Sequence, residues 1–117
     1  MRVISGSFRG TRLVELGDAE IRPTLDRVKE SFFNQVGQDL LGKTFLDLFA
    51  GTGSMGIEAL SRGAKEVLFI EKEAPAQGLI IRNLEKCRMM SADQINRWQL
   101  IKRDALEFVL VLKEKGV

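Results

Sequence analysis

The chain has 117 residues, with 18 lysines and arginines against 16 aspartates and glutamates, 44% hydrophobic residues, one cysteine, no histidine and no tyrosine. This length and apolar content predict one folded domain and argue against a disordered chain or a multidomain protein. Without histidine there is no imidazole base or metal ligand, and Cys87 alone forms neither an internal disulfide nor a thiolate zinc cluster. The sequence therefore predicts no metal site, and its chemistry must come from carboxylates, backbone groups or a bound cofactor.

The apolar runs are short and the charges are unevenly spread. No segment approaches the roughly 20 apolar residues of a membrane helix, and the first residues lack a signal-peptide core, which predicts a soluble cytoplasmic protein without membrane contact. The net charge of +2 is too small to indicate nucleic acid by itself. Two stretches are basic, however, and each is either a solvated face or a surface for a polyanion. They are residues 1–12, with Arg2, Arg9 and Arg12, and residues 82–103, with Arg82, Lys86, Arg88, Arg97, Lys102 and Arg103.

Residues 1–42 are expected to form an N-terminal arm and a helix. Residues 2–5 and 11–16 are two short extended segments joined through Gly6 and Gly10, which is typical of a β-hairpin. Beyond the arm, an amphipathic helix is predicted between a threonine N-cap and a terminal glycine. Its cap is Thr24, after Pro23; its expected buried stripe is Leu25, Val28, Phe32 and Val36; and its end is Gly37.

From Lys43 onward, predicted strands and helices alternate. Three strand and helix units in succession predict a parallel sheet with helical crossovers, that is, an α/β doubly wound fold. The predicted strands are residues 44–49, 66–71 and 98–101. The predicted helices are residues 54–62, a helix from Pro75 with Ile80, Leu84 and Cys87 on one face, and a helix capped by Asp104 with the stripe Ala105, Phe108, Val109 and Leu112.

Three parallel strands are few for a sheet that should be covered on both faces. In such folds the first strand lies centrally, with further strands on its other side. We therefore expect residues 43–117 to be the first half of a truncated domain whose C-terminal strands are missing, and the chain to be a fragment of a longer protein. The free edge of the first strand is expected to favour association of the isolated chain.

The most informative stretch is residues 47–56, DLFAGTGSMG. Gly51 and Gly53 permit positive φ and close backbone approach, and the helix N-terminus beyond them presents free N–H groups. Glu71 follows at the end of the second strand, where its carboxylate can accept two hydrogen bonds from a ribose diol. A glycine turn between a strand and a helix, followed by this acid, predicts an adenosine-containing cofactor.

A nicotinamide dinucleotide and S-adenosylmethionine (SAM) both suit this geometry. Asp47 favours SAM, because a carboxylate before the turn suits the SAM ammonium and would repel a pyrophosphate. Asp47 can also cap the glycine turn through backbone N–H groups, and the two roles are compatible. Asp104 can accept a hydrogen bond from the adenine amine or can only cap its helix, and both alternatives remain open.

Several segments together carry a resemblance to a known family. They are residues 1–6 (MRVISG), 9–10 (RG), 22–24 (RPT), 26–30 (DRVKE), 47–53 (DLFAGTG), 58–64 (EALSRGA) and 71–72 (EK). From residue 1 to about residue 105 the chain resembles the RsmD family of bacterial 16S ribosomal RNA guanine-N2 methyltransferases. The resemblance is specific, because the RPT and RVKE elements lie outside the general cofactor motif.

The resemblance implies a Rossmann-like, SAM-dependent methyltransferase fold that acts on a guanine exocyclic amine, with 16S rRNA or the 30S subunit as partner and a monomer at full length. It implies that Asp47, Gly51 and Gly53 line the methionine end of SAM, that Glu71 holds the ribose, and that Asp104 and Ala105 border the adenine. Phe49, Thr52 and Lys72 are assigned to the same site. The arm and residues 22–30 are implied to approach RNA or cover the cofactor, with Arg2, Arg9, Arg12, Arg22, Thr24 and Arg27 as the RNA-binding residues.

One element of the family pattern is absent. The family carries an Asp/Asn-Pro-Pro-Tyr motif that receives the flipped-out guanine, whereas this chain has no proline after Pro75 and no tyrosine. The catalytic residues are therefore unassigned, and the chain alone is expected to transfer methyl groups weakly or not at all. Cys87 is expected to pack against the sheet. Two alternatives remain, a non-catalytic RNA-binding module and a nicotinamide-dinucleotide oxidoreductase domain, and Asp47 argues against the second.

Overall fold

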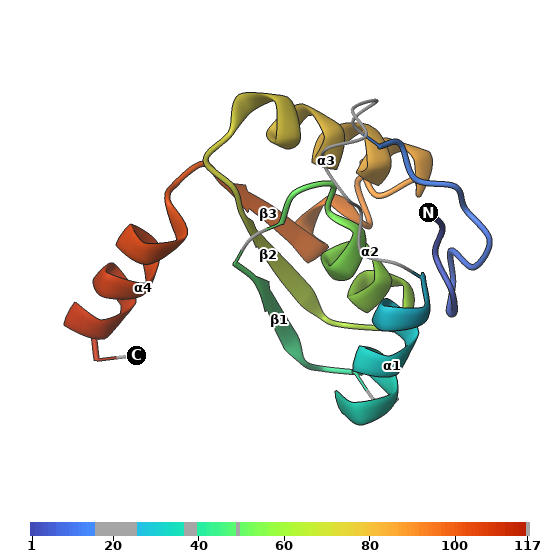
Figure 1. Cartoon of the computed structure of the whole chain (residues 1–117), viewed down its shortest axis with the longest axis horizontal. Helices are drawn as coiled ribbons and strands as arrows, with labels where there is room; N and C mark the ends of the chain where they lie inside the picture. The colour runs from blue at the N-terminus through green and yellow to red at the C-terminus, as the bar shows by residue number, and fades with distance from the viewer. Residues whose placement is uncertain (16–25, 37–39, 49, 117) are drawn as a thin grey trace.

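The computed structural model describes residues 1–15, 26–36, 40–48 and 50–116 (Figure 1). Four helices, three strands and one 3-10 turn follow one another along these residues. They are α1 (Asp26–Val36), β1 (Thr44–Asp47), α2 (Ser54–Ser61), β2 (Glu66–Ile70), α3 (Ala74–Lys86), the 3-10 turn (Ile95–Arg97), β3 (Trp98–Ile101) and α4 (Ala105–Glu114). Among the described residues, no helix is long and apolar enough to cross a membrane.

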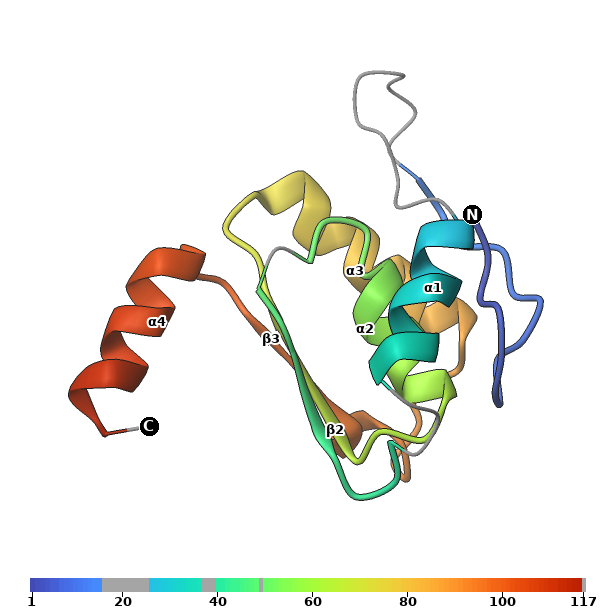
Figure 2. The same cartoon turned by 60° about the horizontal axis from the view of Figure 1, so that its bottom comes forward.

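The three strands form one parallel sheet in the order β1-β2-β3. Phe45 pairs with Val67, and Val67 pairs with Trp98, so the three strands are aligned in register. Figure 2 shows α1, α2 and α3 on one side of the sheet and α4 on the other. The predicted α/β fold with parallel strands and helical crossovers is confirmed. Within the described part of the chain, β1 pairs with β2 alone and is an edge of the sheet.

Helix α2 lies very close to the sheet because it contains Gly56. A Cβ at this position would lie 2.4 Å from the Phe69 ring and 2.9 Å from the Val67 side chain, so only glycine fits here. Val67 and Phe69 are completely buried beneath the helix. Proline occupies the first turn of α3, as predicted, and Ile80, Leu84 and Cys87 are buried on the predicted face.

The N-terminal arm is a short hairpin closed by one antiparallel bridge between Arg2 and Arg12. The N–H of Val3 donates to the Thr11 carbonyl at 2.9 Å, and the N–H of Leu13 donates to the Met1 carbonyl at 3.0 Å. Val3 and Leu13 are buried in the main core. The predicted hairpin is thus present, and it is packed against the body of the protein.

The predicted buried stripe of α1 is wrong at Val28, Phe32 and Val36, and Leu25 lies outside the described residues. Val28, Phe32 and Val36 are 51%, 39% and 51% exposed, whereas Lys29 and Phe33 are fully buried. Lys29 can be buried because its ammonium lies 3.4 Å from the Glu58 carboxylate, which neutralises its charge. The alkyl stem of Lys29 then packs in the interior as an apolar side chain would. The helix is therefore rotated by one residue from the orientation that its apolar spacing predicts.

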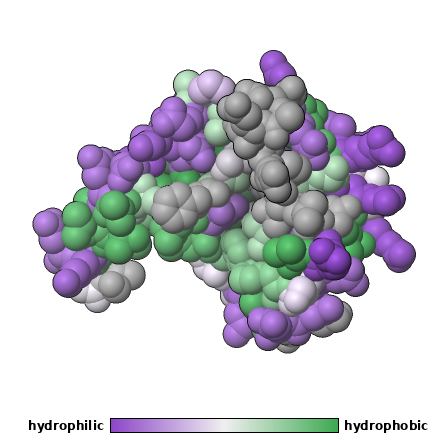
Figure 3. All heavy atoms as spheres, in the orientation of Figure 1, coloured by the Kyte–Doolittle hydropathy of each residue, from purple (hydrophilic) through white to green (hydrophobic). Residues whose placement is uncertain are grey.

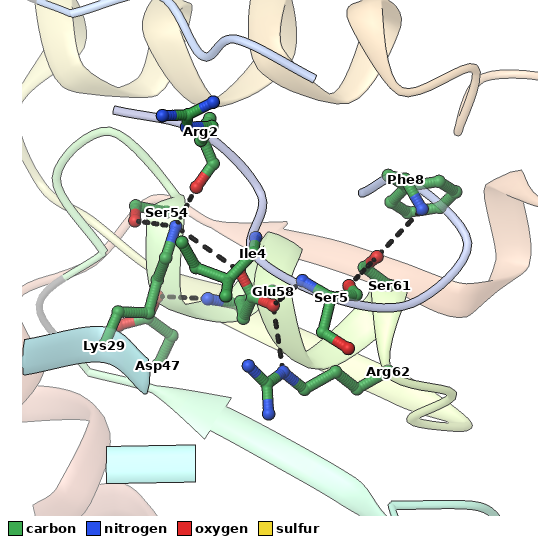
Figure 4. Close-up of polar contacts among 11 residues, drawn as sticks. Arg2, Ile4, Ser5, Phe8, Lys29, Asp47, Ser54, Glu58, Ser61 and Arg62 are labelled. Atoms are coloured by element: carbon green, nitrogen blue, oxygen red, sulfur yellow. Dashed lines mark hydrogen bonds and ion pairs between the residues drawn. The ribbon is translucent and has the colours of Figure 1, made fainter. Parts of the chain in front are cut away.

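Lys29 and Glu58 form a buried ion pair between α1 and α2 (Figure 4). The Lys29 ammonium also donates to the Arg2 carbonyl at 2.7 Å and to the Ser54 hydroxyl at 3.3 Å. A buried charge is tolerated only when hydrogen bonds and a counter-charge replace its hydration shell. Lys29 therefore joins the arm, α1 and the first residue of α2 at one point.

The Glu58 carboxylate completes this junction from the other side. It accepts from the N–H groups of Ile4 at 2.8 Å and Ser5 at 3.1 Å, and from Arg62 Nε at 2.9 Å. One turn further along α2, the Ser61 hydroxyl donates to the Ser5 carbonyl at 2.6 Å and the same oxygen accepts from the Phe8 N–H. The arm is thus hydrogen-bonded along the whole second half of α2.

Among the described residues, most of the exposed large hydrophobic side chains lie in two regions. Figure 3 shows them along α4 and over the region of α1 and β1. On α4 only Ala105 of the predicted stripe is buried, and Val109 is 41% exposed, because this helix projects away from the body of the protein. The exposed large hydrophobic residues of these two regions are Val28, Phe32, Val36 and Leu46, and Leu106, Val109 and Leu110.

Gly6 and Gly10 offer a matched test of how the arm is docked. Both have positive φ, +91° and +86°, but a Cβ at Gly6 would lie 1.9 Å from the Ser61 carbonyl oxygen, whereas one at Gly10 meets nothing within 4 Å. We expect Gly10→Ala to lower the free energy of unfolding by about 1 kcal/mol, the cost of a left-handed alanine. Gly6→Ala is expected to cost about 2–4 kcal/mol, because the arm must also move. Equal losses in urea unfolding would contradict this docking.

Candidate cofactor site

The carboxyl ends of the three strands meet at one edge of the sheet, and the glycine turn follows β1 there. Gly51 and Gly53 have φ of +53° and +82°, the left-handed conformation that glycine adopts without strain. The Gly53 N–H donates to the Ala50 carbonyl at 2.7 Å, and α2 begins immediately after it. The local conformation predicted for this stretch is therefore confirmed.

Asp47 is the last residue of β1 and lies beneath the start of α2. Its Oδ2 accepts from the Gly56 N–H at 3.2 Å, which confirms its predicted capping role. Burial raises the pKa of Asp47 from 3.8 to about 6; the Gly56 hydrogen bond lowers the pKa in part, and the negative charge of Glu71 raises it further. The site thus holds a carboxylate that is costly to ionise and has a second acid nearby.

Glu71 follows β2 and binds the glycine turn directly. Its Oε1 accepts from the Gly51 N–H at 2.9 Å, and its Oε2 accepts from the Glu73 N–H at 3.0 Å. These two bonds tie the turn after β1 to the loop after β2. A hydroxyl-bearing ligand at Glu71 would therefore share a carboxylate that already fixes the backbone of the site.

Asp104 follows the third strand and caps α4. Its Oδ1 accepts from the N–H groups of Leu106 at 2.9 Å and Glu107 at 3.3 Å, so its predicted N-cap role is confirmed. Its Oδ2 lies 3.6 Å from the Lys72 ammonium. The second oxygen is thus not used by the helix cap and pairs with a lysine.

A hollow of about 100 Å³ lies at the strand ends and is lined by Glu71 and Asp104 among others. This volume is well below the roughly 300–1,000 Å³ of a site that encloses a whole ligand. The hollow is large enough for one ring. Four of the residues that line the hollow were predicted from the sequence: Glu71, Lys72, Asp104 and Ala105. The other three, Leu48, Ile70 and Arg103, were not.

The predicted cofactor residues thus fall into two neighbouring groups that share Glu71. Asp47, Gly51 and Gly53 surround the turn, and Thr52 presents its carbonyl to the Asn83 side chain at 2.9 Å. The other group surrounds the hollow. Phe49 was also predicted here, and it lies outside the described residues.

Asn83, on α3, belongs to this site and was not predicted. Its side chain is completely buried and bonds Thr52 of the turn and Val14 of the arm. The buried polar residues Lys29 and Glu58 were likewise missed. The sequence signal for Asn83 is a polar residue on the apolar face of its predicted helix, and this signal does not reveal the partner.

The three predicted RNA-binding arginines of the arm are all exposed. Arg2 and Arg12 face each other across the antiparallel bridge, and Arg2 and Arg9 line a hollow of about 330 Å³ on the arm. Arg27 is exposed on α1, whereas Arg22 and Thr24 lie outside the described residues. The arm therefore presents a small basic surface.

Two residues within the second basic stretch, Arg97 and Cys87, have roles in the fold. Arg97 donates to the carbonyls of Leu60 and Ala64 at 3.0 and 2.8 Å and so caps the end of α2. Cys87 is buried, and burial raises the pKa of its thiol to about 11 in spite of the opposing charge of Lys86. Cys87 was predicted to pack against the sheet, and it is buried in the same core cluster as Val67 and Phe69 of β2.

Solved structures with this architecture define the class of fold. The Escherichia coli protein yhhF, described as a proposed methyltransferase, matches with a TM-score of 0.77 at 29% identity, over 93% of this chain and 55% of its own. The parallel sheet, the glycine turn and the acid after β2 are thus those of a Rossmann-like methyltransferase fold.

The family described as "Conserved hypothetical protein 95" matches residues 1–117, and the chain belongs to this family, the RsmD family. Ribosomal RNA small subunit methyltransferase D of Haemophilus influenzae is 42% identical over 102 residues, which are 86% of this chain and 53% of that protein. The protein of the same name from Escherichia coli K12 is 36% identical over 96 residues, or 82% of this chain and 48% of that protein. The chain therefore spans about half the length of these relatives.

The raised pKa of Asp47 makes a prediction about stability. In the folded state this carboxyl holds its proton up to about pH 6, and in the unfolded state only up to 3.8, so its contribution to the free energy of unfolding falls as the pH rises through this window. We expect Asp47→Asn to be more stable than the unsubstituted chain by about 2–3 kcal/mol at pH 7 and nearly equal to it at pH 3.5.

The control is the exposed Asp93, whose pKa is lowered mainly by the hydrogen bond from the Ser91 hydroxyl. Asp93→Asn is expected to give no gain at pH 7. Urea unfolding of the three proteins across this pH range is the measurement. An Asp47→Asn variant that is less stable than the unsubstituted chain at pH 7 would overturn the assignment.

Proposed function

We propose that this chain supplies the SAM-binding part of a ribosomal RNA methyltransferase that modifies the exocyclic amine of a guanine in 16S rRNA, in the cytoplasm. Membership of the RsmD family and the names of its relatives support the RNA substrate. The identity of the cofactor rests on the chemistry of the candidate site.

The observation that carries the proposal is the acidic, partly desolvated environment of the glycine turn. Asp47 is buried, its pKa is raised to about 6, and the charge of Glu71 contributes to this shift. A pyrophosphate would bring more negative charge to two carboxylates, whereas an ammonium would relieve their repulsion. The donor set therefore fits SAM and disfavours a nicotinamide dinucleotide.

In the proposed complex, different residues of the site would contact different parts of SAM. Asp47 would hold the ammonium end of the cofactor near Gly51 and Gly53, and Glu71 would accept from the ribose hydroxyls. Asp104, with its second oxygen free of the helix cap, would accept from the adenine amine beside Ala105. Phe49, Thr52 and Lys72 belong to the same proposed site.

SAM, when bound, supplies a methyl group on a cationic sulfonium, which makes the methyl carbon electrophilic. The guanine amine is a weak nucleophile because its lone pair is delocalised into the ring, so an enzyme must orient it and accept hydrogen bonds from it. No residue of this chain is assigned to that task. We expect the chain to bind the cofactor and to transfer methyl groups weakly or not at all.

The exposed arginines of the arm are the proposed contacts to the RNA backbone. Arg2, Arg9 and Arg12 lie together on one small hairpin, and guanidinium groups pair well with phosphate oxygens. Arg27 on α1, and Arg22 and Thr24, are proposed to take part in the same contact. The partner would be 16S rRNA within the small ribosomal subunit.

Titration calorimetry with S-adenosylhomocysteine tests the cofactor assignment on this chain. We expect binding that Glu71→Ala weakens by at least tenfold, because the variant loses both the ribose acceptor and the hydrogen bond to Gly51. The matched control is Glu73→Ala, two residues away and exposed, which should bind as the unsubstituted chain does.

The pH provides a second check on the same complex. Since an ammonium must pair with ionised Asp47, affinity is expected to fall as the pH drops below about 6, and Asp47→Asn should remove most of this dependence. No binding by the unsubstituted chain, or equal binding by Glu71→Ala and Glu73→Ala, would count decisively against the proposal.

A further inference from the structure

The side chain of Asn83 bridges two parts of the protein that are far apart in sequence. Its Nδ2 donates to the carbonyl of Val14 at 3.0 Å and to the carbonyl of Thr52 at 2.9 Å, and its Oδ1 accepts from the Val14 N–H at 2.6 Å. The residue is completely buried. Both amide hydrogens and the carbonyl oxygen are therefore used, and a change that leaves a partner unsatisfied costs about 1–3 kcal/mol.

The bond to Thr52 fixes one particular peptide group. The Thr52 carbonyl and the Gly53 N–H belong to the same planar unit, so the orientation of one determines that of the other. Asn83 holds the carbonyl, and the Ala50 carbonyl accepts from the N–H at 2.7 Å. Gly53 is free of the restraint that a Cβ imposes, so without Asn83 this peptide could rotate at the centre of the proposed site.

The bonds to Val14 connect this peptide to the arm. Val14 pairs with Asn83 through both its N–H and its carbonyl, in the manner of a strand neighbour. The next residue back, Leu13, is buried in the main core, and Arg12 before it is exposed. The basic arm and the glycine turn thus share one side chain.

We propose that Asn83 is a positioning residue that locks the Thr52–Gly53 peptide for the cofactor and ties this orientation to the docking of the arm. The inference rests on the proposed function. It makes the arm part of the cofactor site, so that contact with RNA at the arm and cofactor binding at the turn affect each other reciprocally.

Asn83→Asp tests the clamp with little change of shape. The variant keeps the oxygen that accepts from the Val14 N–H and loses the donors to the Thr52 and Val14 carbonyls. We expect S-adenosylhomocysteine to bind between about five and 100 times more weakly, the range of a typical coupling between sites, while the protein remains folded at the assay temperature. Asn96→Asp, the same change at an exposed position of the 3-10 turn, should bind unchanged.

Amide hydrogen exchange, followed by NMR, distinguishes positioning from mere stabilisation. In the unsubstituted chain, saturating S-adenosylhomocysteine is expected to slow the exchange of the Val14 amide as well as the Gly53 amide. In Asn83→Asp it should slow Gly53 alone. A residue that only stabilises the fold would lower the melting temperature and leave this transmission from turn to arm intact.

The outcomes separate the two proposals. If the unsubstituted chain binds no S-adenosylhomocysteine, the proposed function fails, and the inference with it. If it binds, but Asn83→Asp binds equally well and the Val14 amide is unaffected by the ligand, the inference fails and the proposed function stands.

Discussion

The ammonium of Lys29 and the carboxylate of Glu58 lie 3.4 Å apart with no exposed side-chain surface, and such a pair is stable only where hydrogen bonds satisfy both charges. Those bonds come from the arm, through the Arg2 carbonyl and the N–H groups of Ile4 and Ser5. Removing one partner of a buried pair typically costs 3–5 kcal/mol, so the arm, α1 and α2 are stable only together. The arm is therefore a structural part of the protein.

In the candidate site, by contrast, the carboxylate of Asp47 is buried near a second negative charge. The hydrogen bond to Asp47 comes from the neutral Gly56 N–H, and the charge that acts on its pKa is that of a second carboxylate, Glu71. The charge of Glu58 is neutralised by Lys29 and Arg62 of the same chain, and these ion pairs stabilise the fold. A buried acid beside a second acid favours a bound cation, as the proposed binding of the SAM ammonium requires.

Local patterns in the sequence predicted the order of the elements, the strand limits within two residues, the glycine turn, and the caps at Asp47 and Asp104. These features depend on residues close together in the chain. The orientation of α1 and the role of Asn83 depend instead on partners that lie 29 and 31 residues or more away: Glu58 for Lys29, and Thr52 for Asn83. Apolar periodicity counts lysine as a surface residue, and so it assigned the wrong face.

The amide exchange of Ile4 and Ser5 in the native protein tests this central constraint most directly. Residues near a chain terminus usually exchange at nearly the rate of an unfolded chain. Because both N–H groups donate to the buried Glu58 carboxylate, their exchange should be slowed as strongly as that of the Phe69 amide in β2. Exchange of Ile4 and Ser5 at nearly the unfolded rate, with Phe69 protected, would contradict the dependence of the fold on this ion pair.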